Sequence, residues 1–93
     1  MCVTISIMKT TQILYELDPM RIGTVERGLI DEYRAEAKVI DILSSNGMSI
    51  TDAVVRSFNQ RFWVGCLNAD TVQKIVDQIE ENRGVIHVNQ EIA

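Results

Sequence analysis

Apolar residues recur every three or four positions along most of the chain, a spacing that predicts amphipathic helices. The clearest case follows Asn68 and Asp70, either of which can cap a helix, and it ends at Arg83 before Gly84. The apolar stripe of this helix consists of Val72, Ile75, Val76 and Ile79. Polar and charged residues occupy its other sides, so one narrow face is expected to pack against a core.

Two central segments show the same period. Residues 29–47 place Leu29, Tyr33, Ala37, Ile40 and Ser44 on one face. Asp31 and Glu32 would lie in the first turn of that helix, where carboxylates interact favourably with the helix dipole. Gly47 suits a left-handed cap at its end. A further helix is predicted to begin at Ser49, with Asp52 three residues later as in a capping box. Its apolar stripe consists of Ile50, Val54, Phe58 and Phe62.

The N-terminal segment supports two interpretations. Val3, Ile5 and Ile7 alternate with polar residues as in a strand, but they also extend a helical stripe that continues to Leu17. Lys9 to Leu17 is predicted to be helical, and Asp18 is the expected boundary because a residue before proline disfavours the α region. Residues 1–7 could instead be an extension of the folded domain, and residues 85–93 form a C-terminal tail.

These patterns predict a single all-α domain of 93 residues, a compact four-helix bundle-like fold. Met20 to Gly28 is expected to be a loop. The alternative is an α+β ferredoxin-like domain. In that fold Val3–Ile7, Phe62–Leu67 and Val85–Val88 would be strands.

The charge balance restricts the partners that the chain can bind. Nine Lys and Arg against thirteen Asp and Glu give a net charge of −4. Nucleic-acid binding is not expected, because it requires a clustered basic surface. An acidic protein can instead attract a basic protein partner, since opposite potentials accelerate encounter.

The two cysteines and the N-terminal residues indicate the redox state and the compartment in which the chain is expected to work. Cys2 and Cys66 lack a CxxC spacing and are too few for a disulfide framework, so reduced thiols are expected. Residues 1–8 read MCVTISIM, which fits no signal peptide, and no apolar run approaches the length of a membrane helix. The sequence therefore predicts a cytoplasmic protein that does not enter membranes.

No catalytic, metal or cofactor site is predicted. His87 is the only histidine and has no evident partner for acid–base chemistry or metal binding. Asp31, Glu32 and Glu36 cluster at a predicted helix start, with Glu26 and Asp41 nearby, and we interpret them as a solvated helix start. No phosphate-binding loop or nucleophile motif occurs. Catalysis is therefore not expected.

The segment from Arg56 to Trp63 holds the strongest candidate for binding. If the helix continues through Trp63, this indole lies on the side of Arg56 and Gln60, away from Phe58 and Phe62. Trp and Arg are common hot-spot residues in interfaces. Packing of Trp63 beneath the last helix or the N-terminal segment is the competing interpretation. Arg61, like Arg56, is expected to extend into solvent.

Three short motifs occur in order along residues 10–63: Ile13-Leu14-x-x-Leu17-Asp18-Pro19, Asp31-Glu32-Tyr33-x-x-Glu36 and Phe58-x-x-x-Phe62-Trp63. Together they resemble a family of small bacterial proteins of unknown function. Leu17 stands where that family has Trp. The resemblance implies an all-helical intracellular fold and no particular reaction. In this arrangement Tyr33 would pack its ring inward while its hydroxyl bonds to Asp18 or a loop carbonyl.

We therefore predict a non-enzymatic protein-binding module, for example an immunity protein that neutralises a basic toxin, or an accessory protein. The candidate partner-binding residues are Arg56, Gln60, Trp63, Asp31 and Glu32. The alternatives are a ligand-sensing domain of ferredoxin-like type and a homo-oligomeric structural protein. A homodimer would bury spare apolar positions such as Ile5, Met8, Ile42 and Trp63 between its subunits.

Overall fold

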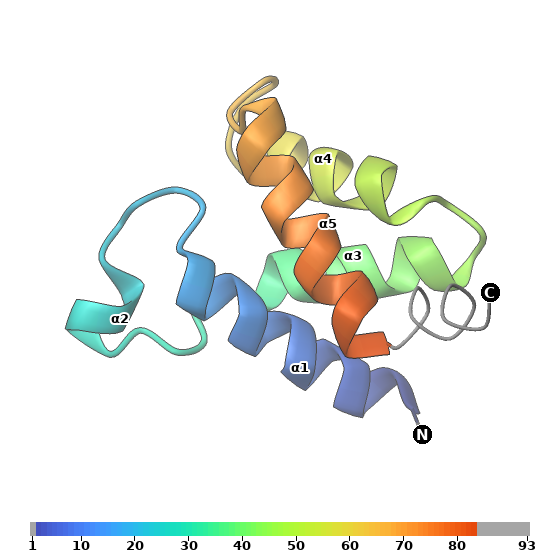
Figure 1. The fold of residues 1–93 in the computed structure, drawn as a ribbon, viewed down its shortest axis with the longest axis horizontal. Coiled ribbons are helices and arrows are strands. Elements are labelled where there is room, and N and C mark those ends of the chain that lie inside the picture. The colour runs from blue at the N-terminus through green and yellow to red at the C-terminus, as the bar shows by residue number, and fades with distance from the viewer. Residues whose placement is uncertain (1, 84–93) are drawn as a thin grey trace, which may run out of the picture.

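The computed structural model describes the backbone of residues 2–83 and the side-chain surroundings of residues 6–82. It contains five helices, α1 (Cys2–Leu17), α2 (Thr24–Arg27), α3 (Arg34–Ser45), α4 (Ile50–Arg61) and α5 (Ala69–Arg83). Helix α1 packs on α3 and α5, and α4 packs on both α3 and α5, so the four long helices enclose one core (Figure 1). The predicted all-α, bundle-like fold is confirmed.

The ferredoxin-like alternative is wrong, because residues 2–83 contain no strand. Residues 3–7 belong to α1, which runs without interruption from Cys2 to Leu17. Residues 62–67 form the irregular connection between α4 and α5. The third predicted strand, Val85–Val88, lies outside the described residues, as do His87 and the tail 85–93.

The core is built from the apolar stripes that the periodicity predicts. Its twelve buried hydrophobic residues are Ile13, Leu14, Tyr33, Ala37, Ile40, Ala53, Val54, Phe58, Val72, Ile75, Val76 and Ile79. Phe58 lies near the centre, with its ring centroid 5.9 Å from that of Tyr33 and 5.8 Å from that of Phe62. Burial of these side chains is the main force that holds the helices together.

Two predicted helix starts are confirmed by their caps. The Ser49 hydroxyl accepts the Asp52 N–H at 3.1 Å at the start of α4, and the Asn68 Oδ1 accepts the Thr71 N–H at 2.8 Å at the start of α5. These bonds satisfy N–H groups that have no partner within the helix. Gly47 follows α3 with a φ of 103°, as predicted for a left-handed termination.

The predicted start of the second helix is wrong. Helix α3 begins at Arg34, five residues after Leu29, and Asp31 and Glu32 precede it. The reason is that the Leu29 N–H donates to the Thr24 carbonyl at 2.8 Å and so closes α2, within a segment expected to be a loop. The acidic residue in the first turn of α3 is therefore Glu36.

Asp18 organises the connection between α1 and α3. Its carboxylate accepts the N–H groups of Ile22 at 3.0 Å and Gly23 at 2.8 Å, and the Tyr33 hydroxyl at 2.9 Å. The same hydroxyl accepts the Met20 N–H at 2.9 Å. The predicted bond between Tyr33 and Asp18 is thus confirmed, and it fixes the loop against the start of α3.

Candidate functional site

Among residues 47–82, the most exposed large apolar side chains lie on α4 and in the loop after it. Val55 is 36% exposed, Trp63 59% and Val64 83%. Val55 and Val64 line one open hollow of about 530 Å³. The other residues that line it are Met48, Asp52, Arg56, Asn59 and Gln60. An apolar surface with a polar rim is typical of protein-binding sites.

The loop that carries Val64 is held in place by hydrogen bonds. The Asn59 side-chain oxygen accepts the Gly65 N–H at 3.0 Å, and the Cys66 N–H donates to the Trp63 carbonyl at 3.1 Å. Gly65 has a φ of 78°, a conformation that a residue with a Cβ adopts at a cost. The half-buried Cys66 thiol donates to the Phe58 carbonyl across 3.6 Å. Val64 is therefore presented to solvent by an ordered turn.

Trp63 does not lie where the sequence places it. Helix α4 ends at Arg61, so Trp63 leaves the helical face of Arg56 and Gln60. It lines a separate hollow of about 350 Å³, between the α1–α2 and α4–α5 connections. Packing beneath the last helix is also wrong, because most of the indole is exposed; its ring meets Phe62 edge-on, with centroids 6.3 Å apart.

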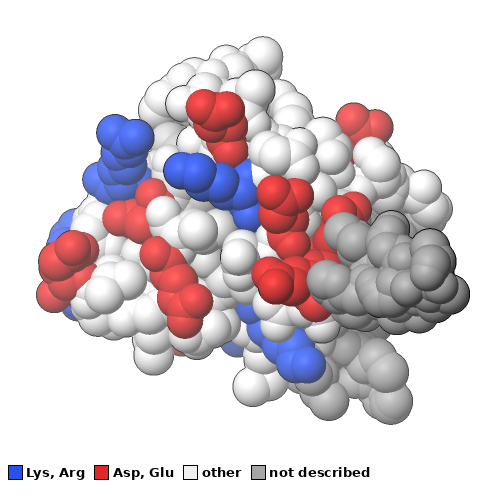
Figure 2. All heavy atoms as spheres, viewed as in Figure 1, with Lys and Arg blue, Asp and Glu red and all other residues white. Residues whose placement is uncertain are grey.

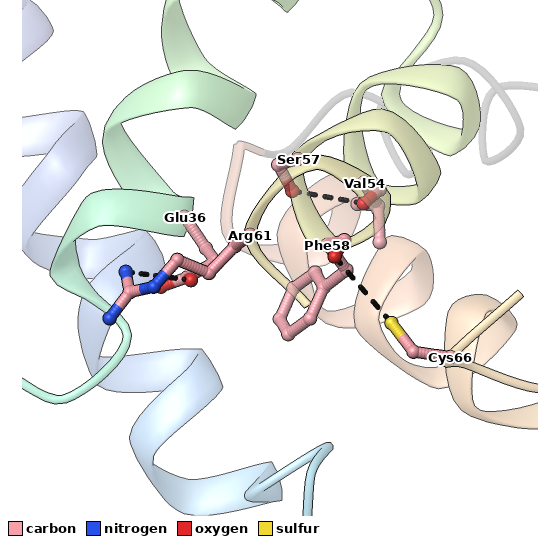
Figure 3. Close-up of polar contacts among 6 residues, drawn as sticks. All are labelled: Glu36, Val54, Ser57, Phe58, Arg61 and Cys66. Atoms are coloured by element: carbon pink, nitrogen blue, oxygen red, sulfur yellow. Dashed lines mark hydrogen bonds and ion pairs between the residues drawn. The ribbon is translucent and has the colours of Figure 1, made fainter. Parts of the chain in front are cut away.

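Glu36 is the residue whose surroundings differ most from expectation. Its side chain is 1% exposed, and its Oε2 accepts the Arg61 Nη1 donor at 3.0 Å. Figure 3 shows the two side chains meeting between α3 and the end of α4. The solvated interpretation of Glu36 is therefore wrong, whereas Arg61 is exposed as predicted and also bonds to the buried carboxylate. Arg61 reaches back from the last turn of α4, and its Cζ lies 5.7 Å from the centre of the Phe62 ring.

Burial raises the pKa of Glu36 above its ordinary value. The residue's own backbone N–H and the Arg61 guanidinium lower it by less, and the nearby Glu32 carboxylate adds to the rise. A buried carboxylate with a single ion-pair partner retains an unfavourable desolvation energy in its charged form. The ion pair therefore joins α3 to α4 without fully compensating the buried charge.

Asp31 and Glu32 are exposed, as expected for solvated carboxylates. They line a hollow of about 470 Å³ together with Arg61 and the turn at residues 28–30. A third hollow, of about 230 Å³, lies between α3 and α4. It is lined by Ala35, Glu36, Val39, Ser57, Gln60 and Arg61.

Shared residues connect these hollows into one surface. Arg61 lines two of the hollows, the one that contains Asp31 and Glu32 and the one that contains Glu36. Gln60 also lines two, the one that contains Glu36 and the one that contains Val55 and Val64. We call this run of three hollows the α3–α4 surface. Four of the predicted binding residues lie on it, namely Arg56, Gln60, Asp31 and Glu32, whereas Trp63 lies apart.

The sequence reasoning missed three residues of this surface. Val64 lies in the segment Phe62–Leu67, for which the sequence predicts a strand only in the ferredoxin-like alternative, although the following Gly65 is a loop signal. Glu36 and Arg61 are 25 residues apart, and nothing in the helical periodicity reports their contact. A hydrogen bond between two helices depends on how they pack.

The described residues hold neither a metal cluster nor a membrane span. No group of three or more His, Cys, Asp or Glu within them could bind a metal ion. None of the helices within residues 2–83 combines the length and the apolar character needed to cross a bilayer.

Acidic side chains on α5 create a negative electrostatic potential around this helix. Figure 2 shows them gathered over the middle and the C-terminal part of α5. Asp77 and Glu81 of this helix are exposed and Glu80 is half-buried. Such a field attracts a basic partner over a distance of about 8–10 Å at physiological salt.

The chain matches no protein-family model, and comparisons with curated proteins and with solved structures give no match. The family resemblance of residues 10–63 stays a prediction. Function must therefore be inferred from the residues of the α3–α4 surface and from the exposed loop.

Proposed function

We propose that this chain is a non-enzymatic protein-binding domain, and that a basic protein docks on the α3–α4 surface. The observation that carries this proposal is Val64, which an ordered turn holds 83% exposed beside the apolar hollow of Val55. A rigid, exposed apolar side chain is costly in water and favourable in an interface, because docking removes it from solvent without ordering a loop. A toxin that the bound chain neutralises is one partner of this kind.

The net charge of −4 supports a partner of opposite charge. Asp31 and Glu32 lie at one end of the surface and Val64 at the other, so a docked protein would meet carboxylates and an apolar contact together. Complementary potentials raise association rates and exclude like-charged partners. Two copies of this chain would instead bring like charges together, which disfavours self-association.

The test is affinity capture from the native lysate with matched baits. The wild-type chain is compared with Val64→Asp, which places a charge in the apolar contact, and with Val25→Asp. Val25 is a control because it is 50% exposed on α2 and lines none of the three hollows of the α3–α4 surface. We expect a basic protein that the wild-type and Val25→Asp baits retain and that the Val64→Asp bait loses.

Absence of any protein whose capture depends on Val64 would contradict the proposal. Light scattering of the purified chain at several concentrations provides a second control. A concentration-dependent dimer abolished by Val64→Asp would show that the surface binds a second copy and not a basic protein.

A further inference from the structure

Only one of the two carboxylate oxygens of the buried Glu36 has a hydrogen-bond partner among the described residues. Oε2 bonds to Arg61, but Oε1 has no hydrogen-bond partner among the described residues. The Ser57 hydroxyl, which lines the same hollow, donates to the Val54 carbonyl at 2.9 Å and not to this oxygen. Buried polar atoms in folded proteins almost always have a partner, so an acceptor of this kind points to a donor that binds there.

The hollow beside Glu36 has the dimensions and lining for a single extended side chain. Its volume is about 230 Å³, and Ala35 and Val39 supply an apolar wall on α3. Gln60 and Arg61 line it from α4, and the Arg61 side chain is 46% exposed. Figure 3 shows Arg61 reaching along α3 to Glu36. Oε1 itself is buried, so a ligand that binds it requires the neighbouring side chains, including the half-exposed Arg61, to move aside.

The charges around the hollow favour a cation. Glu36 is within it, Asp31 and Glu32 line the adjoining hollow, and Arg61 is the one cation that lines either of them. Three carboxylates against one guanidinium leave an excess of negative charge. A second cation would share Glu36 with Arg61, and the neighbouring carboxylates would offset the repulsion between the two.

The single unoccupied oxygen favours an ammonium over a guanidinium. Arginine binds carboxylates best through two parallel hydrogen bonds, which need both oxygens, and Oε2 is already taken. Lysine is a point donor on an apolar stem, and its methylenes can lie against Ala35 and Val39 while the ammonium reaches Oε1.

We propose that the hollow between α3 and α4 receives a lysine side chain of the partner protein, whose ammonium donates to Glu36 Oε1. This proposal rests on the proposed function, since it names the partner residue that the α3–α4 surface recognises. It can be tested without the partner.

The experiment is a titration of the ¹⁵N-labelled chain with N-acetyl-lysine amide, followed by amide chemical shifts. N-acetyl-norleucine amide, which has a similar stem and no charge, is the control probe. We expect saturable shifts at Ala35, Val39, Ser57 and Gln60 with the lysine probe and none with the norleucine probe. Glu36→Gln should weaken the binding at least about tenfold.

Ala35→Leu is a second variant, because it fills the hollow and leaves every charge in place; it should also abolish the response. Where Glu36→Gln does not fold, Ala35→Leu decides the result. Equal shifts with both probes, shifts elsewhere, or a response that survives these substitutions would overturn the proposal. Val25→Asp should retain the response to lysine. The titration needs no partner protein, so failure of this titration and failure of partner capture are distinguishable.

Discussion

Arg61 Nη1 donates to Oε2 of Glu36 across 3.0 Å, joining the last turn of α4 to the first turn of α3. The carboxylate is buried while the guanidinium is half-exposed, so the two members of the pair are not equivalent. Glu36 bears the desolvation cost, whereas Arg61 keeps part of its hydration. This asymmetry gives the surface a buried acceptor beside a partly solvated cation.

Glu36 should make stability depend on pH above 4.5. Because the pKa of Glu36 is raised in the folded state, the native chain binds more protons than the unfolded chain between 4.5 and that raised value. The free energy of unfolding should therefore fall as pH rises through this window, and the contribution of Glu36 should be fully present below pH 4.5. Urea denaturation from pH 4 to 8 measures the effect.

Glu36→Gln is the variant that isolates this contribution, since a neutral amide replaces the carboxyl. The difference in unfolding free energy between Glu36→Gln and wild type should increase with pH across the window and then level off. Arg61→Met removes a charge that lowers the pKa of Glu36, so it should extend the wild-type window to higher pH. A difference that is constant with pH would show that Glu36 does not titrate as described.

Tyr33→Phe should destabilise the fold by about 1–2 kcal/mol. The ring stays buried, but the Asp18 carboxylate loses a donor and the Met20 N–H loses its acceptor. Tyr15→Phe is the matched control. Tyr15 is half-buried, and with no described side-chain bond to lose its substitution should lie within about 0.5 kcal/mol. Equal effects of the two substitutions in urea denaturation would show that the Tyr33 hydroxyl contributes nothing to stability.

Asp18 should give the fold an acid-sensitive connection. Burial tends to raise the pKa of Asp18, but the N–H groups of Ile22 and Gly23 and the Tyr33 hydroxyl outweigh it, so the pKa lies below 3.8. Its stabilisation is thus fully present above pH 3.8 and is lost as pH falls through the lowered value.

Asp18→Asn should cost about 2 kcal/mol at neutral pH, because an amide cannot accept all of these donors at both of its ends. Asparagine tolerates the φ of 46° at this position, so the loss reports the hydrogen bonds and not backbone strain. Thermal denaturation at pH 7 and pH 3 measures the size of this loss and its dependence on the charge of the Asp18 carboxylate. A loss that is as large at pH 3 as at pH 7 would contradict the role of the charged carboxylate.

Periodicity predicted the elements well wherever a stripe and a cap agreed. Helix α5 has both, with its stripe from Val72 to Ile79 and its cap at Asn68, and it was placed correctly. Prediction failed at residues 29–33, where the apolar period continues but a hydrogen bond from Leu29 to Thr24 ends another helix first. The spacing of apolar residues alone does not show which carbonyl accepts a given backbone N–H.

The candidate site was predicted in part. Arg56, Gln60, Asp31 and Glu32 share one surface, but the residues that connect them came only with the packing of α3 on α4. Trp63 was misplaced because α4 stops at Arg61, two residues before it. Where a helix stops decides which face the next side chains occupy, and the run FWVGCL does not specify that position.

The most direct test of the account is the dissociation constant of the captured basic protein for wild type and Val64→Asp, measured by calorimetry. We predict that Val64→Asp binds about 30-fold or more weakly, corresponding to a loss of about 2 kcal/mol, and that Val25→Asp binds within about twofold of wild type. Added salt should weaken the wild-type complex. Binding of Val64→Asp within about twofold of wild type would contradict the claim that a partner docks on the α3–α4 surface.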